Sequence, residues 1–153
     1  MRDGFVIVDS HGPQLLSALP AHPRLLKVNA SEAAEATGLP IGSPDDALRA
    51  CRALVDLGAQ SAVVTLGGTG SVGRDVDGTE IRCSLSQAGG SWSVGSGDAF
   101  LAAAAVRLAE GSGLATAMAD ATAAGAANSK MMGAGRFDPA EMKRLRRSVV
   151  IEA

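Results

Sequence analysis

Short runs of apolar residues alternate with longer stretches in which apolar positions recur at helical spacing. Each short run is bounded by turn-forming residues, which is typical of a buried β-strand. The pattern predicts three such strands, at residues 5–8, 24–28 and 61–66. It predicts a short helix or turn at 14–19 and helices at 32–37, 44–57, 98–110, 114–131 and 140–147. This alternation predicts an α/β fold with a mainly parallel sheet flanked by helices.

Turn and cap residues refine this pattern. Residues 71–76 and 79–83 flank Asp77-Gly78, and this dipeptide between two β-rich runs predicts one antiparallel hairpin. Ser43 is a good N-cap and Pro44 suits the first helical position that follows it. Gly38 is a natural helix end.

Composition and charge limit the classes of function. The chain has 153 residues, 46% of them hydrophobic, which predicts a single α/β domain over residues 1–153. A formal net charge of -2 gives no electrostatic reason to expect a nucleic-acid or membrane partner. The basic cluster Lys143, Arg144, Arg146 and Arg147 is interpreted as a solvated helix face.

The cysteines and the first residues bear on the compartment. Cys51 and Cys83 lie far apart in the sequence and fit no metal-binding spacing, so we expect free thiols in a reducing cytosol. The first residues do not have the pattern of a secretory signal peptide. Both observations favour a cytoplasmic protein.

The most informative segment runs from Val94 to Phe100, where glycines directly precede a predicted helix. Backbone N–H groups at a helix start can point at one anion, and the helix dipole adds about half a positive charge there. Asp98 falls in the first turn of this helix. Two roles are open to its carboxylate: capping with dipole compensation, or general-base catalysis beside an anion site for a phosphoryl group.

Two other segments have the same ambiguity. Asn29 and Glu32 are three residues apart, so they either cap and support a helix start or position a hydrated magnesium ion near phosphate. The stretch from Thr65 to Gly70 follows a predicted strand. It is either a tight turn into the hairpin or part of a ligand site at the carboxyl ends of the strands.

In this order, the segments resemble the ribokinase-like carbohydrate kinases of the PfkB family. The matching positions are Asp9-Ser10-x-Gly12, Asn29-x-x-Glu32, Thr65-x-Gly67-x-x-Gly70 and Gly95-x-Gly97-Asp98. Residues 123–128 and 133–137 resemble the family's late segments. The last stretch is most similar to the branch of 1-phosphofructokinase and tagatose-6-phosphate kinase.

The resemblance implies a ribokinase-like fold and ATP-dependent phosphorylation of a sugar or sugar phosphate. By resemblance, Asp98 would be the catalytic base, and the backbone donors for the transferring phosphoryl group would be Gly95, Ser96 and Gly97. The nucleotide phosphates and ribose would be bordered by Thr65, Gly67 and Gly70, and the adenine would lie near Ala124, Ala127 and Asn128. Magnesium and phosphate would be organised by Asn29 and Glu32.

The chain also departs from the family pattern. Trp92 and Ser93 stand where the family usually has Asp or Asn followed by Thr, Ala103 replaces a common helix glycine, and Val28 replaces a common proline. Family members are longer, and every matched motif belongs to their C-terminal half. We therefore expect the N-terminal strands, which carry the sugar-binding residues, and the small β lid to be missing.

Three hypotheses remain. The chain is the ATP-binding and catalytic half of a sugar kinase that uses ATP and Mg²⁺, or a nucleotide-binding module without catalysis, since the acceptor site is missing. The third hypothesis is a non-catalytic remnant that forms a homodimer through an exposed sheet edge.

Overall fold

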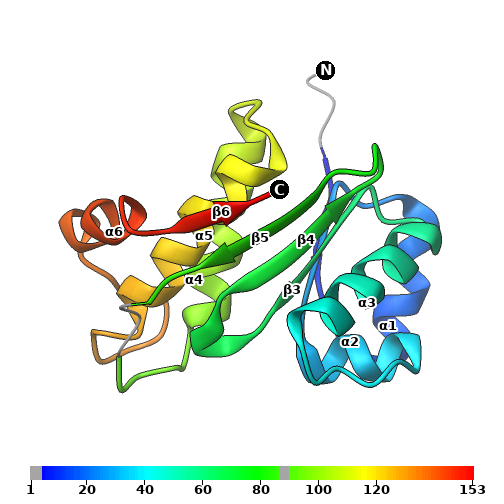
Figure 1. Ribbon diagram of the computed structural model, residues 1–153, viewed down its shortest axis with the longest axis horizontal. Helices are drawn as coiled ribbons and strands as arrows, with labels where there is room; N and C mark the ends of the chain where they lie inside the picture. Colours follow the sequence, from blue (N-terminus) through cyan, green and yellow to red (C-terminus); the bar gives the residue numbers. More distant parts are fainter. Residues whose placement is uncertain (1–4, 87–89) are drawn as a thin grey trace. The chain divides into compact units, whose positions relative to one another are not determined.

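The computed structural model describes residues 5–86 and 90–153 and shows a six-stranded mixed sheet with six α-helices in that part of the chain (Figure 1). The strand order is β1 (Ile7–Asp9), β2 (Leu25–Asn29), β3 (Ser61–Thr65), β4 (Ser71–Asp75), β5 (Glu80–Ser84), β6 (Val150–Glu152). The helices are α1 (Gly12–Ala18), α2 (Ala30–Thr37), α3 (Pro44–Asp56), α4 (Ser96–Ala109), α5 (Leu114–Asn128) and α6 (Pro139–Arg146). Short 3₁₀ turns are η1 (Leu19–Ala21) and η2 (Gly67–Thr69). The α/β fold predicted from the sequence is confirmed.

The chain divides into two compact units. Unit 1 comprises Met1–Leu66 and Val72–Glu80, and unit 2 comprises Gly67–Ser71 and Ile81–Ala153. The expectation of a single domain over residues 1–153 stays a prediction, because compactness alone does not show whether two units fold independently. The predicted glycine-rich loop begins at Gly89, which lies outside the described residues.

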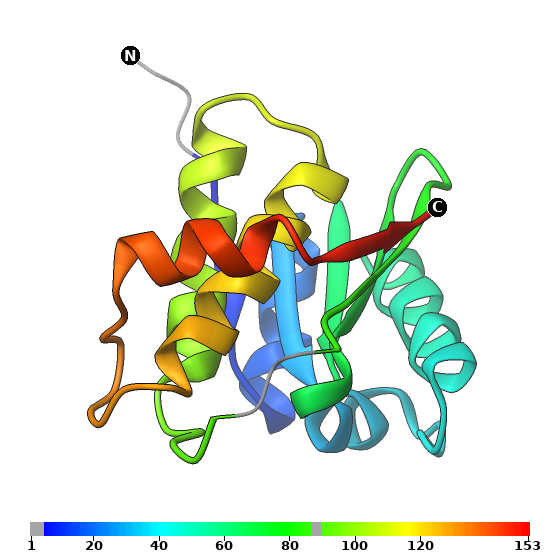
Figure 2. The ribbon, with the colours of Figure 1, turned by 60° about the vertical axis from the view of Figure 1, so that its left-hand side comes forward.

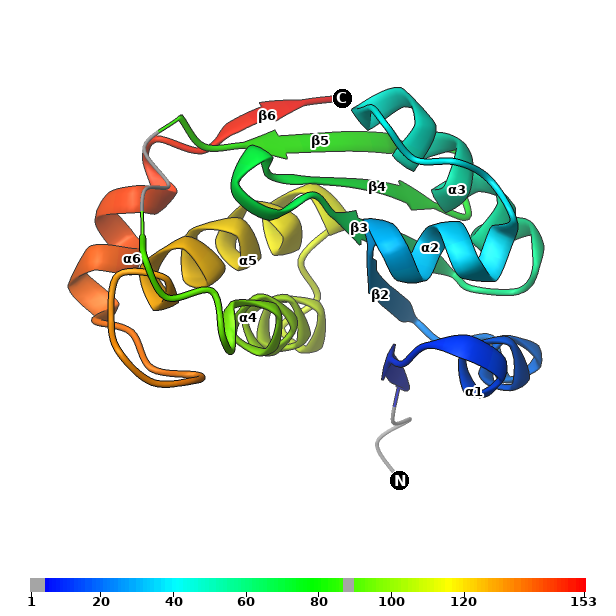
Figure 3. The same cartoon turned by 90° about the horizontal axis from the view of Figure 1, so that it is seen from below.

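Unit 1 is an α/β layer with parallel strands. β1 pairs with β2 and β2 with β3, both in parallel, as the sequence predicts. Helices α1, α2 and α3 pack on one face of these strands (Figure 3). Leu26 and Val28 of β2 point into that core, where they join Leu15 and Leu54 from the helices. Because side chains alternate along a strand, Lys27 lies on the opposite face of the sheet.

The caps in unit 1 follow the sequence signals. The Ser43 hydroxyl accepts a hydrogen bond from the Asp46 N–H at 3.2 Å, and Pro44 occupies the first turn of α3. Gly38 ends α2 in the left-handed conformation, with φ of 71°. Both predicted caps are confirmed.

The first strand differs from its prediction. Residues 5–8 are expected to form a buried strand, but β1 spans Ile7–Asp9, and the exposed fractions of Phe5 and Val6 are 42% and 54%. In the sheet formed by the described residues, β2 is the one neighbour of β1, so β1 is an edge strand there. An apolar run shows that a segment is β-prone but does not show whether a second strand covers it.

The hairpin at Asp77-Gly78 is confirmed. β4 and β5 are neighbours in the sheet, and the turn between them is closed by a bond from the Asp75 N–H to the Thr79 carbonyl at 2.9 Å. The Asp77 carboxylate accepts from the Thr79 N–H at 2.8 Å. A connection this short cannot form a crossover, so the two strands run antiparallel.

Unit 2 consists of α4, α5 and α6 with β5 and β6. Figure 2 shows α6 crossing in front of α5 before the chain continues into β6. β6 pairs antiparallel with β5. The sequence does not predict this strand, because it is three residues long and exposed throughout. The helix predicted at 114–131 ends earlier, at Asn128, and residues 129–131 continue as a turn.

A buried carboxylate connects the three helices of unit 2. Asp120 of α5 is 5% exposed and accepts from Arg107 Nε of α4 at 2.5 Å and from Arg146 Nε of α6 at 2.6 Å. The interpretation of the basic cluster as a solvated face is therefore wrong for Arg146. A pattern of like charges on one helix does not reveal a buried partner on another.

Both cysteines are free and buried. Burial raises the pKa of the Cys51 thiol to about 12 and that of the Cys83 thiol to about 11. Both thiols are thus neutral and inert at physiological pH. Within the described residues, no helix is long and apolar enough to cross a membrane.

Glu80, at the start of β5, forms ion pairs with two arginines. Its carboxylate accepts from Arg52 Nε at 2.6 Å and from Arg74 Nη1 at 2.7 Å. The Arg52 hydrogen bond is the main cause that lowers the pKa of Glu80 to about 2. The folded pKa lies below the ordinary value of 4.5, so the stabilisation is complete above pH 4.5 and is lost as the pH falls through about 2.

We therefore expect Glu80→Gln to lower Tm at pH 7 by up to about 2–4 °C, a small effect because these side chains are partly solvated. The difference from the wild type should disappear near pH 2. Glu35→Gln, on the exposed side of α2, is the control and should change little at either pH. An equal Tm difference at both pH values would contradict the assignment.

Candidate functional site

The start of α4 is open. Its N-cap is Gly95, which has φ of 82° and no side chain to close the helix end. The first helical hydrogen bond runs from the Ala99 N–H to the Gly95 carbonyl at 2.9 Å, so the N–H groups of Gly97 and Asp98 precede it. The sequence predicts a helix start at Asp98, and the helix instead begins at Ser96. The left-handed Gly95 allows the chain to enter the helix two residues earlier.

Asp98 lies in the first turn, as predicted, and is exposed. Among the described residues, its carboxylate makes no capping bond and no ion pair. Of the two roles open to it, side-chain capping is therefore not seen, and only dipole compensation remains as a structural role. The carboxylate is open to solvent.

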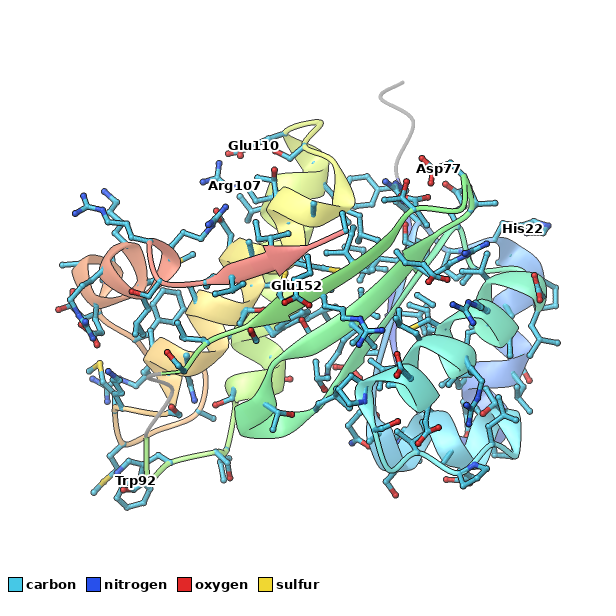
Figure 4. All side chains as sticks on the ribbon, viewed as in Figure 1. His22, Asp77, Trp92, Arg107, Glu110 and Glu152 are labelled. Atoms are coloured by element: carbon cyan, nitrogen blue, oxygen red, sulfur yellow. The ribbon has the colours of Figure 1, made fainter. Side chains whose placement is uncertain are left out.

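The loop before α4 is held by hydrogen bonds from a side chain of α5. The Asn128 amide, at the end of α5, donates to the Val94 carbonyl at 3.0 Å and to the Ser96 hydroxyl at 3.2 Å. The Ser96 N–H bonds to the Ser93 carbonyl at 3.1 Å, so this predicted phosphate donor is engaged within the loop. The Trp92 side chain projects outward and is 45% exposed (Figure 4).

The residues predicted near adenine lie inside unit 2. Ala124 is fully buried, Ala127 is 1% exposed, and Asn128 is fully buried. All three belong to the last turns of α5, as expected, but their side chains pack in the interior. Contact between these residues and a nucleotide stays a prediction. The contacts seen for Asn128 instead order the loop before α4.

The turn after β3 is a tight one. Gly67 opens η2, and Gly70, with φ of 115°, lies so close to the Cys83 carbonyl that no side chain fits. Gly70 therefore has a packing reason of its own to be glycine. A Cβ at Gly67 would meet nothing within 4 Å, so there is open space beside this residue.

In unit 1, Asn29 and Thr65 are register partners at the carboxyl ends of β2 and β3. Asn29 Oδ1 accepts from the Glu32 N–H at 2.9 Å, and Glu32 Oε2 accepts from the Asn29 N–H at 2.8 Å. This is a complete capping box, so the capping role of the pair is confirmed. Within the described residues, no group of three or more His, Cys, Asp or Glu side chains forms a metal cage.

Sequence reasoning misses one polar pair near these strand ends. Lys27 is 7% exposed, and its ammonium donates to Asp9 Oδ2 at 2.7 Å. The sequence signal is a single lysine between Leu26 and Val28 in an otherwise apolar run, because a lysine in a buried strand needs a partner. The pair is a charged feature that joins the end of β1 to the middle of β2.

Comparison with known proteins identifies a family for the chain. A family model described as pfkB family carbohydrate kinase matches residues 3–141. A search of the curated proteins finds no match. The similar solved structures support the ribokinase-like fold that the sequence predicts.

Three of these structures illustrate the likeness. A Staphylococcus aureus protein provisionally described as a phosphofructokinase is 29% identical with a TM-score of 0.86, over 97% of this chain and 48% of that chain. Phosphofructokinase-2 from Escherichia coli in complex with potassium is 28% identical with a TM-score of 0.86, over 94% and 47%. Arabidopsis thaliana ribokinase with ribose and ATP is 26% identical with a TM-score of 0.78, over 94% and 47%.

The chain thus spans about half the length of these three structures. Similarity to the narrower branch of 1-phosphofructokinase and tagatose-6-phosphate kinase stays a prediction.

Gly95 offers a direct test of the loop geometry. A Cβ at Gly95 would overlap Ala134 and Gly135, whereas one at Gly111, with a similar φ of 84°, would meet nothing within 4 Å. We expect Gly111→Ala to destabilise by about 1 kcal/mol through backbone strain alone. Gly95→Ala should destabilise by about 2–5 kcal/mol, since overpacking adds to that strain.

Urea unfolding followed by circular dichroism measures both variants, and Gly111→Ala is the matched control for the positive φ. Equal losses of stability would show that the loop of residues 133–136 does not pack against Gly95.

Proposed function

We propose that this chain, which belongs to the pfkB family of carbohydrate kinases, carries the ATP-binding and catalytic part of a sugar or sugar-phosphate kinase. The observation that carries the proposal is the start of α4. There the exposed carboxylate of Asp98, which has no ion-pair partner among the described residues, adjoins backbone donors that no described side chain caps. An acid beside an anion site is the arrangement that phosphoryl transfer to a hydroxyl requires.

Asp98 is the proposed general base. Its carboxylate takes the proton of the acceptor hydroxyl as the oxygen attacks the terminal phosphorus of ATP, and ADP leaves with the electron pair of the broken P–O bond. Negative charge on the transferring group is stabilised by the segment Gly95, Ser96 and Gly97. Within this first turn the Gly97 and Asp98 N–H groups are the proposed hydrogen-bond donors, and the helix dipole adds a positive potential.

The nucleotide phosphates and ribose are proposed to be bordered by Thr65, Gly67 and Gly70. The open space beside Gly67 supports a close approach of phosphate oxygens to the backbone. Ala124, Ala127 and Asn128 are proposed to shape the adenine side from within α5. Their burial favours a supporting role, because a base would meet the loop that Asn128 holds rather than these buried side chains.

Magnesium fits Asn29 and Glu32 in a limited way. Each residue uses one oxygen in the capping box, which leaves one Glu32 carboxylate oxygen for a hydrated ion. Mg²⁺ is commonly held by one or two carboxylates together with water and phosphate oxygens. When bound, it neutralises charge on the phosphates.

The acceptor is proposed to be a sugar or sugar phosphate, and the compartment the cytoplasm. E. coli phosphofructokinase-2 has been solved with fructose-6-phosphate, at 27% identity and a TM-score of 0.80, which suggests a first compound for assay. Since the chain spans about half of such structures, activity and oligomeric state are tested on the longest natural form of the protein.

We expect Mg·ATP to bind with a dissociation constant below the millimolar range, measured by calorimetry and by Trp92 fluorescence. Asp98→Asn should lower turnover by about a hundredfold or more and leave ATP affinity nearly unchanged, because only the base is lost. Asp138→Asn is the matched control. Asp138 caps α6 through the Ala140 N–H, and asparagine caps almost as well, so turnover and stability should both hold.

The outcomes separate the hypotheses. ATP binding without turnover on a panel of sugars and sugar phosphates favours the nucleotide-binding module. Absence of ATP binding together with a stable homodimer favours the non-catalytic remnant. Normal turnover in Asp98→Asn would show that Asp98 is not the base.

A further inference from the structure

We propose that Asn128 is a positioning residue, whose buried amide holds residues 92–96 in the shape that presents the backbone donors at the start of α4. That these donors bind a phosphoryl group rests on the proposed function. The clamp itself rests on contacts within unit 2.

The three hydrogen bonds of Asn128 define the clamp. The residue is fully buried at the last position of α5. Its Nδ2 donates to the Val94 carbonyl at 3.0 Å and to the Ser96 hydroxyl at 3.2 Å, and its Oδ1 accepts from the Arg136 N–H at 3.0 Å. A backbone carbonyl can only accept and a backbone N–H can only donate, so these partners fix which way the amide points.

The amide joins two segments that lie far apart in the sequence. On one side it holds Val94 and Ser96, and on the other it holds Arg136. Between these points Gly95 packs directly against Ala134 and Gly135, where no side chain fits. The loop before α4 and the loop after α5 therefore share one anchor, and movement of either is resisted by the other.

Neighbouring contacts extend the clamp along the loop. The Trp92 N–H donates to the Ser129 carbonyl at 3.0 Å, and Gly90 lies against Ser129 so closely that a Cβ would overlap it. Residues 90–97 contain three glycines, whose backbones have more freedom than those of other residues. An external anchor thus supplies the order that the loop's own sequence does not.

Only an amide satisfies all three partners. Alanine would leave the Val94 carbonyl and the Arg136 N–H without their partner, and aspartate would face the Val94 carbonyl with a second acceptor. Donors that stabilise charge in a transition state are effective only if they are held in place beforehand. Loss of the clamp should therefore weaken anion binding even though the Asn128 amide is not itself one of the proposed donors.

Trp92 reports on the clamp without any ligand, because it is the single tryptophan of the chain and lies in the loop. We expect Asn128→Ala to raise the acrylamide quenching constant of Trp92 by roughly twofold, since a released loop samples more open conformations. We also expect the dissociation constant for ADP with Mg²⁺ to rise by about tenfold, as the donors lose their fixed direction.

Two control variants separate positioning from general loosening. Asp120 lies about two turns before Asn128 on α5 and pairs with Arg107 and Arg146. Asp120→Asn should weaken these ion pairs and lower stability without changing a contact of the loop. Ser129→Ala removes a hydroxyl that bonds to the Ala126 carbonyl and lies beside Gly90, and it keeps the Ser129 carbonyl that accepts from the Trp92 N–H. Both should leave Trp92 quenching and ADP affinity unchanged. A rise in quenching with Asp120→Asn equal to that with Asn128→Ala would overturn the inference.

Ser96→Ala keeps the test decisive if Asn128→Ala does not fold. It removes one acceptor of the Asn128 amide at a partly buried site, so a smaller rise in Trp92 quenching is expected. Unchanged quenching would overturn the clamp. If the wild type binds no ADP up to millimolar concentration, the proposed function fails while quenching still decides the clamp. If the wild type binds ADP and Asn128→Ala binds it equally well, the positioning role is wrong and the proposed function stands.

Discussion

The open start of α4 depends on an anchor that the helix does not itself contain. Gly95 brings the chain into the helix in a left-handed conformation and offers no side chain to cap it. Because Gly95 has no side chain, the N–H groups at the helix start stay uncapped and the segment has little rigidity of its own. The buried amide of Asn128 resolves this conflict, because it fixes Val94 and Ser96 while it leaves the donors of Gly97 and Asp98 uncovered.

The two helix starts with candidate chemistry solve the capping problem in opposite ways. At the start of α2, Asn29 and Glu32 satisfy each other's backbone N–H groups in a capping box. At the start of α4 no side chain of the described residues does so. A closed start is stable alone and has little left to offer an anion, whereas an open start is useful to a ligand and needs support. This contrast is why the catalytic proposal rests on α4 and only a limited, water-mediated role is proposed for α2.

Sequence reasoning succeeds where the signal is local and fails where the cause lies in another element. The hairpin at Asp77-Gly78 and the cap at Ser43 follow from neighbouring residues, and both are found. The glycine-rich loop before α4 is visible in the same way, because its residues are contiguous. By contrast, no residue near Arg146 in the sequence indicates that its partner is the buried carboxylate of Asp120. The role of Asn128 is equally hidden, because its partners lie 34 and 32 residues before it and 8 residues after it.

The small side chains of α5 are part of the same mechanism. A Cβ at Gly125 would lie 3.1 Å from the Ser96 carbonyl oxygen, so the first turn of α4 rests almost directly on the backbone of α5. This close approach brings Ser96 within reach of the short Asn128 side chain, one turn further along. A larger residue at position 125 would push the turn away from the amide as well as strain the packing. The alanine-rich composition of α5, together with Gly125, thus sets the distance at which the clamp can act.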